Sequence, residues 1–180
     1  MTESDFNNVF TAVRRLCLDS GRDWLQFVIW ECSPENLTEC IDWWLTNTGS
    51  PHPAVQITDD QQPKFVTVED ECRHRIRSLD GYPGNDVFGH VGGHVWQFEW
   101  WRSDDIDAYA IRMRGDGLAF FDSLNERERF RLVLDYAFAL RVVSAGKVVA
   151  ITPWHDRIGD LAGDWSDSIM LHPRVELGDL

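Results

Sequence analysis

The sequence predicts an α+β fold for residues 1–180: a single domain with a largely antiparallel, twisted sheet and three to four helices packed mainly on one face. Apolar runs of strand length alternate along the chain with stretches of helical periodicity, which favours a mixed architecture. Residues 94–102 and 108–114 alternate apolar and mixed side chains on either side of a polar turn. That pattern is typical of an antiparallel hairpin with one partly open face. Residues 124–144 carry the clearest helical pattern.

The N-terminal third predicts two helices on either side of a buried strand. In residues 4–18 apolar side chains recur at i, i+3, i+4 and i+7, as on an amphipathic helix. Residues 24–30, WLQFVIW, form a continuous apolar run that is typical of a central strand covered on both faces. Ser33 and Pro34 suit the N-cap and the first position of a second helix, which Gly49 ends.

The middle of the chain predicts short strands, one helix and a loop. Residues 50–63 predict a loop with a short strand at 55–58, and residues 64–68, KFVTV, predict a further strand. Residues 67–79 predict a helix whose first turn is acidic and whose later turns are basic, as the helix dipole favours. Residues 80–93, DGYPGNDVFGHVGG, predict a loop because glycine, proline and asparagine recur in them.

The last third predicts a strand, the long helix, another strand and an irregular end. Residues 117–121, GLAFF, follow a tight turn and predict a third strand beside the hairpin. Ser123 and Glu126 have the spacing of a capping box at the start of the long helix. Residues 147–151, KVVAI, predict a buried strand. From about 153 to 180 we expect a loop-rich, acidic segment of the same domain.

Composition indicates a cytoplasmic protein. The first ten residues have neither a basic nor an apolar stretch, so no secretory signal is expected. No stretch of 18 apolar residues is present, so no transmembrane helix is expected. The four cysteines, Cys17, Cys32, Cys40 and Cys72, form no C-x-x-C pair, and we expect them to be buried free thiols.

The chain is strongly acidic, with 30 Asp and Glu residues against 17 Lys and Arg and a net charge of −13. The acidity is concentrated at the two ends: residues 1–60 have a net charge of −7, residues 61–155 of −2 and residues 156–180 of −4. Direct nucleic-acid binding is disfavoured because phosphate contacts need a basic surface. The charge instead favours encounter with a basic protein surface.

A metal site at the two histidines His90 and His94 is disfavoured by their spacing. On a helix, residues four apart would share a face, but Gly92 and Gly93 lie between these two. On a strand they would lie roughly 13 Å apart, too far for one ion. Only a bent loop, with His155 or an aspartate as a third ligand, could bring them together. We predict no metal ligands, and keep a metal-dependent or Cys/His hydrolase built on residues 81–94 as an alternative.

Other catalytic signatures are missing from the sequence. The glycines of residues 81–93 match neither G-x-x-x-x-G-K-[ST] nor G-x-G-x-x-G, and the chain has no G-x-S-x-G. Carboxylate pairs suited to acid–base work arise by chance among 30 acids. We therefore predict no catalytic residues and no cofactor.

Tryptophans that lie among carboxylates are the strongest functional signal, because they resemble interface hot spots ringed by charge. One group lies on the acidic side of the second predicted helix, one on the less apolar side of the strand at 94–102, and one in the acidic end of the chain. The predicted partner-binding residues are Glu35, Glu39, Asp42, Trp43, Glu99, Trp101, Asp160, Asp164, Trp165 and Asp167.

These observations predict a small, acidic, non-enzymatic protein-binding module. Its composition resembles that of immunity proteins and of phage anti-defence inhibitors, including anti-CRISPR proteins, which act stoichiometrically. The expected partner is a protein with a basic surface, such as a nuclease or another nucleic-acid-binding protein, which the module would occlude. We expect no direct contact with nucleic acid, no membrane partner, and a monomer or homodimer. A DNA mimic with two rows of carboxylates at phosphate-like spacing is a further alternative.

Overall fold

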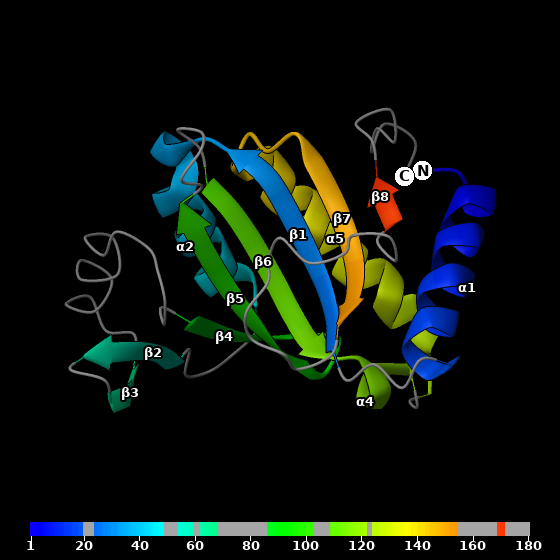
Figure 1. The fold of residues 1–180 in the computed structure, drawn as a ribbon, viewed down its shortest axis with the longest axis horizontal. Helices are drawn as coiled ribbons and strands as arrows, with labels where there is room; N and C mark the ends of the chain where they lie inside the picture. The colour runs from blue at the N-terminus through cyan, green and yellow to red at the C-terminus, as the bar shows by residue number, and fades with distance from the viewer. Residues whose placement is uncertain are drawn as a thin grey trace.

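The computed structural model describes residues 1–19, 24–48, 54–59, 62–67, 86–102, 109–121, 124–154 and 169–171. Within these residues an eight-stranded antiparallel sheet carries four α-helices, which confirms the predicted α+β fold (Figure 1). The helices are α1 (Glu3–Asp19), α2 (Leu37–Asn47), α4 (Gly117–Phe121) and α5 (Glu126–Val143), and the 3-10 turn η1 (Pro34–Asn36) precedes α2. The strands are β1 (Trp24–Cys32), β2 (Ala54–Asp59), β3 (Gln62–Thr67), β4 (Asp86–Val91), β5 (His94–Arg102), β6 (Tyr109–Asp116), β7 (Val148–Trp154) and β8 (Ile169–Leu171).

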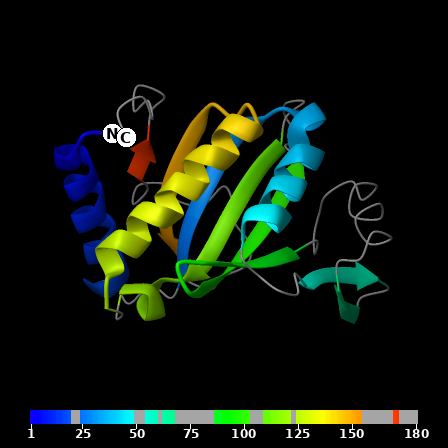
Figure 2. The ribbon, with the colours of Figure 1, turned by 180° about the vertical axis from the view of Figure 1, so that it is seen from behind.

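The strands lie in the order β3-β2-β4-β5-β6-β1-β7-β8. Helices α2 and α5 lie across the same face of this sheet, and α1 lies beside its β7–β8 end (Figure 2). No described helix covers the opposite face, which is turned toward the viewer in Figure 1. We call this second face the open face.

Strict alternation of side chains separates the two faces of the central strands. In β1, Leu25, Phe27 and Ile29 are fully buried in the main core, whereas Val28 forms a small separate cluster with Ala110 of β6. The apolar residues of the β5–β6 hairpin behave as predicted, because Trp96, Phe98, Trp100, Ile111 and Met113 all belong to the main core. The main core therefore lies between the sheet and the helices.

Phe130 of α5 packs against side chains from α1, β1 and α4 within this core. Its ring has no exposed surface, and its centroid lies 5.6 Å from that of Phe10 in α1 and 6.1 Å from that of Phe27 in β1. The ring of Phe121 in α4 is also 6.1 Å away. Aromatic pairs at such separations contribute about 0.5–1.5 kcal/mol beyond their buried area. Helices α1, α4 and α5 are thus connected to the sheet through one side chain.

The prediction of a loop over residues 80–93 is wrong for residues 86–91. These residues form strand β4, which pairs with β5. Gly92 and Gly93 make the connecting turn, with φ angles of +61° and +83°. Two consecutive positive φ angles are what a tight type I′ hairpin turn requires, and glycine adopts them without steric cost. The glycine pair is therefore a hairpin signal.

Residues 117–121 form helix α4 instead of the predicted strand. The Asp116 carboxylate accepts a hydrogen bond of 2.9 Å from the backbone N–H of Ala119, which caps the first turn. Phe120 and Phe121 are both buried in the main core, whereas consecutive residues of a strand point to opposite faces. A helical turn buries both rings together.

The predicted capping box does not start α5. The helix begins at Glu126 with Asn125 as its N-cap, in a left-handed conformation with φ of 64°, and Ser123 lies outside the described residues. Residues 68–79 of the helix predicted at 67–79 also lie outside them, and Thr67 ends β3. The segment from residue 153 onward was expected to be mainly irregular. Within it, residues 169–171 form strand β8, which pairs with β7.

Three cysteines follow the prediction: Cys17, Cys32 and Cys40 are buried free thiols, and burial raises the pKa of Cys32 to about 11 and that of Cys40 to about 12. Cys72 lies outside the described residues. None of the described helices has the length and apolar character needed to cross a bilayer.

Gly89 of β4 is required by the close approach of the end of α2. A Cβ atom at this position would lie 2.3 Å from the Oγ1 of Thr48, which is buried and donates a hydrogen bond of 2.8 Å to the carbonyl of Trp44. We predict that Gly89→Ala lowers the free energy of unfolding by about 1–3 kcal/mol, measured by urea denaturation. Adding Thr48→Gly should recover part of this loss, and strictly additive costs would contradict the contact.

Candidate functional site

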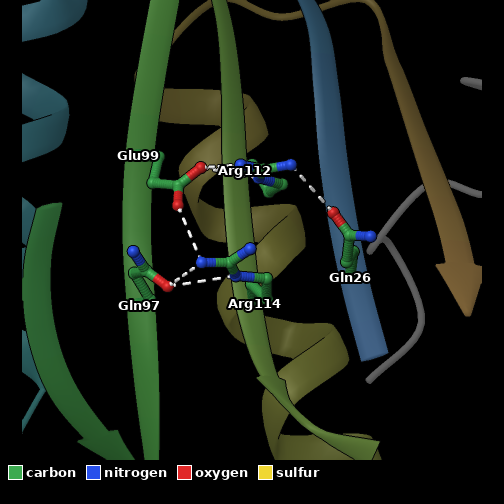
Figure 3. Close-up of polar contacts among 5 residues, drawn as sticks. All are labelled: Gln26, Gln97, Glu99, Arg112 and Arg114. Carbon is green, nitrogen blue, oxygen red and sulfur yellow. Dashed lines mark hydrogen bonds and ion pairs between the residues drawn. The ribbon is translucent and has the colours of Figure 1, made fainter. Parts of the chain in front are cut away.

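The open face carries a row of polar side chains across its three central strands (Figure 3). Arg114 of β6 is paired in the sheet with Gln97 of β5 on one side and with Gln26 of β1 on the other. Arg112, two residues earlier on β6, is paired with Glu99 of β5. Because side chains on paired positions of an antiparallel sheet lie about 5 Å apart at Cβ, the register itself assembles this cluster. We call these five residues the polar row.

Glu99 is the centre of the hydrogen bonds in the polar row. Its Oε2 accepts a bond of 2.7 Å from the Nε of Arg112 and a second from the Nη2 of the same side chain. Its Oε1 lies 3.3 Å from the Nη2 of Arg114. Arg112 also donates through Nη1 to the Oε1 of Gln26, at 3.2 Å, and Arg114 donates through Nε to the Oε1 of Gln97, at 3.0 Å. One carboxylate thus orients two guanidinium groups.

The polar row is largely shielded from solvent. Side-chain exposure is 14% for Glu99, 17% for Arg112 and 20% for Arg114. The guanidinium of Arg114 lies over the ring of Trp24, 4.8 Å from its centroid, where the indole face attracts a cation. Glu99 is the shared carboxylate of the two arginines, and Arg112 makes at least one further contact.

The predicted acidic group on the second helix lies on the other side of the sheet. Glu35 of η1 and Glu39 of α2 are both exposed, and neither makes an ion pair with a described residue. Both lie in the first turn of their element, where the helix dipole favours negative charge. Asp42 lies one turn later, is partly buried and makes further contacts. Glu99 does not join this group, because its side chain belongs to the open face.

Trp43 packs between the helices. Its ring meets that of Tyr136 in α5 edge-on, with centroids 5.3 Å apart, and the Tyr136 hydroxyl donates a 2.6 Å hydrogen bond to the carbonyl of Asn47. The indole is partly buried and packs against the main core. Trp43 therefore joins α2 to α5, and its role in partner binding remains a prediction.

Several predicted partner-binding residues have no described side chain. The backbone of Trp101 is paired with Ala110, which extends β5 beside the polar row, but its side chain lies outside the described part. The acidic and tryptophan residues predicted near the C-terminal end lie outside it entirely: Asp160, Asp164, Trp165 and Asp167.

His90 and His94 lie on opposite faces of the β4–β5 hairpin. His94 is paired with Val91, a core residue, whereas His90 is paired with Val95, which is 53% exposed. The described part of the chain contains no group of three His, Cys, Asp or Glu side chains that could hold a metal ion. Residues 81–85 of the loop proposed for the hydrolase alternative lie outside the described residues.

His94 has a structural role between the hairpin and the helices. Its Nε2 lies 2.9 Å from the Nη1 of Arg129 in α5, and its ring centroid lies 5.4 Å from that of Phe120 in α4. Arg129 can only donate, so the Nε2 of His94 accepts and the ring is neutral. Burial lowers the pKa of His94, the neighbouring Arg129 lowers it further, and Asp116 opposes both effects.

Comparisons of this chain with protein-family models, with curated proteins and with solved structures found no match. Its functional residues must be inferred from its own chemistry. Sequence reasoning selected Glu99 but missed Gln26, Arg112 and Arg114, which surround it. The available signal was charge complementarity: two arginines on the mixed side of one hairpin strand can face a glutamate on the mixed side of the other.

We predict that Glu99→Gln lowers the free energy of unfolding by about 2–3 kcal/mol, because two partly buried guanidinium groups would lose their shared carboxylate. Chemical denaturation at low ionic strength measures this change. The matched control is Glu126→Gln, which removes the more exposed pair with Arg14 and should cost less than about 1 kcal/mol. Equal losses in the free energy of unfolding for the two variants would show that Glu99 stabilises the fold no more than a surface ion pair does.

The lowered pKa of His94 predicts a pH-dependent contribution to stability. Between the folded-state pKa and the ordinary value of about 6.5, the unfolded chain binds a proton that the folded chain does not. This contribution is therefore fully present above pH ~6.5 and is lost as the pH falls through that window. Urea unfolding from pH 5 to 8 should show a weaker rise in His94→Gln than in the wild type. An unchanged slope in His94→Gln would contradict the assignment.

Proposed function

We propose that this protein is a small, acidic, non-enzymatic binding module that occludes the basic surface of a protein that handles nucleic acid, such as a nuclease. The observation that carries the proposal is the pair Glu35 and Glu39, which are exposed on the helix-covered side and unpaired within the described residues. Their charges are available to a partner. Immunity proteins and phage anti-defence inhibitors are the functional classes that fit this character.

The ion pairs of three other described glutamates support this choice of surface. Glu3 pairs with Arg127 and Arg131, Glu126 with Arg14, and Glu31 with Lys147. These charges are already compensated within the chain, so they contribute little to an encounter with another protein. Glu35 and Glu39 are exposed and make no ion pair with a described residue, which favours contact with Arg or Lys side chains.

Long-range attraction would come from the whole chain. The described residues hold 14 acids and 11 bases, a net charge of −3, so −10 of the net −13 resides in the rest of the sequence. A field of this sign accelerates encounter with a basic protein and is screened by salt over about 8–10 Å. In the proposed mechanism the field steers the encounter, and the α2 carboxylates then engage basic side chains. The aromatic pair of Trp43 and Tyr136 beside them provides an apolar centre for the contact.

The proposal predicts that reversing charge on α2 slows association. Affinity capture from the native host, followed by identification of the captured protein, supplies the partner for kinetic measurement. In Glu39→Lys the association rate constant should fall about three- to tenfold at low salt, and less at high salt.

Glu128→Lys is the matched control for this measurement. Glu128 is also an exposed helical glutamate without an ion pair to a described residue, but it lies on α5. The change in net charge is the same, so a smaller effect in this variant would locate the contact at α2. Equal effects in the two variants, or a captured partner without a basic surface, would overturn the proposal.

A further inference from the structure

We propose that His94 is a proton-controlled latch: in its neutral form it holds the β4–β5 turn against α5, and in its protonated form it releases the turn toward Asp116. The latch does not depend on the proposed contact at Glu35 and Glu39, which lie on other elements. Three features of the described residues support it: the hydrogen bond to Arg129, the close fit of the turn on α5, and a carboxylate at the start of α4.

The contact with Arg129 requires His94 to be neutral. The Nη1 of Arg129 lies 2.9 Å from the Nε2 of the imidazole, and a guanidinium carries donors only. The Nε2 atom must therefore present a lone pair, which it keeps only in the neutral ring. Protonation places a hydrogen on Nε2 and brings two positive charges together at hydrogen-bond distance. The contact that attracts the neutral ring thus repels the protonated ring.

The β4–β5 turn packs on the same arginine. A Cβ atom on Gly92 would lie 3.5 Å from the Cγ of Arg129 and 3.8 Å from the Cδ2 of Leu132, so the turn lies against the aliphatic parts of both side chains. His94 also meets the ring of Phe120 in α4, with centroids 5.4 Å apart. Because Arg129 contacts both the turn and the imidazole, breaking its bond to His94 loosens the turn.

Two charged side chains of the described residues act on His94. Burial lowers the pKa of His94, Arg129 of α5 lowers it further, and Asp116 at the end of β6 raises it. Helix α4 has no titratable side chain, and the β4 residue paired with His94 is Val91. The Oδ1 of Asp116 accepts the backbone N–H of Ala119, and its Oδ2 makes no hydrogen bond with a described residue. Asp116 therefore offers a carboxylate oxygen to the protonated ring.

The other charges in the first turn of α5 are directed elsewhere. Glu126 pairs with Arg14 and Arg127 pairs with Glu3, so both of these pairs face α1. Glu128 is exposed to solvent. The proton balance at the latch therefore depends on burial and on the two charged side chains that act on the imidazole.

The direction of the pH response follows from the lowered pKa of His94. In the released form the imidazole is solvated, and we expect its pKa to return toward the ordinary value of about 6.5. The released form then binds a proton more readily than the docked form, so a falling pH favours release. Between about pH 6.5 and the lower pKa of the docked form, the ratio of released to docked molecules rises about tenfold for each pH unit.

Nuclear magnetic resonance on the isotope-labelled full chain tests the latch from about pH 5 to 8. The imidazole signals of His94 report its protonation, and the amide signals of Gly92 and Gly93 report the state of the turn. A nuclear Overhauser effect between the rings of His94 and Phe120 reports the docked form. We expect the turn signals to shift together with the imidazole, at an apparent pKa below 6.5, and the Overhauser effect to weaken over the same range.

Variants separate release from protonation itself. Arg129→Gln keeps a donor but removes the repelling charge, so the pKa of His94 should rise and the turn should stay docked at about pH 5. The matched control, Arg127→Gln, removes the same charge from α5, where the side chain pairs with Glu3, and should release the turn as the wild type does. In His94→Gln the amide oxygen can accept from Arg129 but does not titrate, so the turn should show no transition. Asp116→Asn keeps an oxygen for the cap of α4 and should move the transition to lower pH.

Four results would overturn the proposal. Turn signals that stay constant while the imidazole titrates would show that protonation does not move the turn. The same transition in His94→Gln would assign it to another group. Equal behaviour of Arg129→Gln and Arg127→Gln would show that the repulsion does not come from Arg129. An unchanged transition in Asp116→Asn would show that this carboxylate does not receive the protonated ring.

Discussion

The alternation of side chains along β1, β5 and β6 is the constraint on which the rest of the structure depends. Helices α2 and α5 cover one face of these strands, so every second residue must be apolar and well packed. Phe27, Trp96 and Met113 meet that requirement. The intervening residues do not face the helices and need not be apolar. They can carry charge as long as opposite charges pair with one another. The polar row is therefore a consequence of a sheet covered by helices on one side.

The same constraint separates two surfaces of different chemistry. On the helix side, Glu35 and Glu39 present uncompensated negative charge, and nearby rings hold α2 against α5. On the open face, the arginines of β6 outnumber the carboxylate between them. Glu99 and Trp24 hold the guanidinium groups of this face in place.

Local patterns in the sequence were sufficient for the fold class and for the faces of the hairpin strands. Period-two alternation identified β5 and β6, and helical periodicity identified α1, α2 and α5. Residues 117–121 were misassigned because short apolar runs suit a strand and a buried helical turn equally, and burial of both phenylalanines decided between them. The polar row escaped prediction because Gln26 and Arg112 are 86 positions apart, and only the strand order places β1 beside β6.

Glu99 organises the open face electrostatically, and a double-mutant cycle measures this role. Glu99→Gln, Arg112→Gln and the double variant are unfolded in urea, and the coupling energy between the two side chains is calculated. We expect a favourable coupling of about 1–3 kcal/mol that decreases only slightly in salt, because both side chains are largely shielded from solvent. A coupling near zero would contradict it, and would make Arg112 and Glu99 an ordinary surface pair.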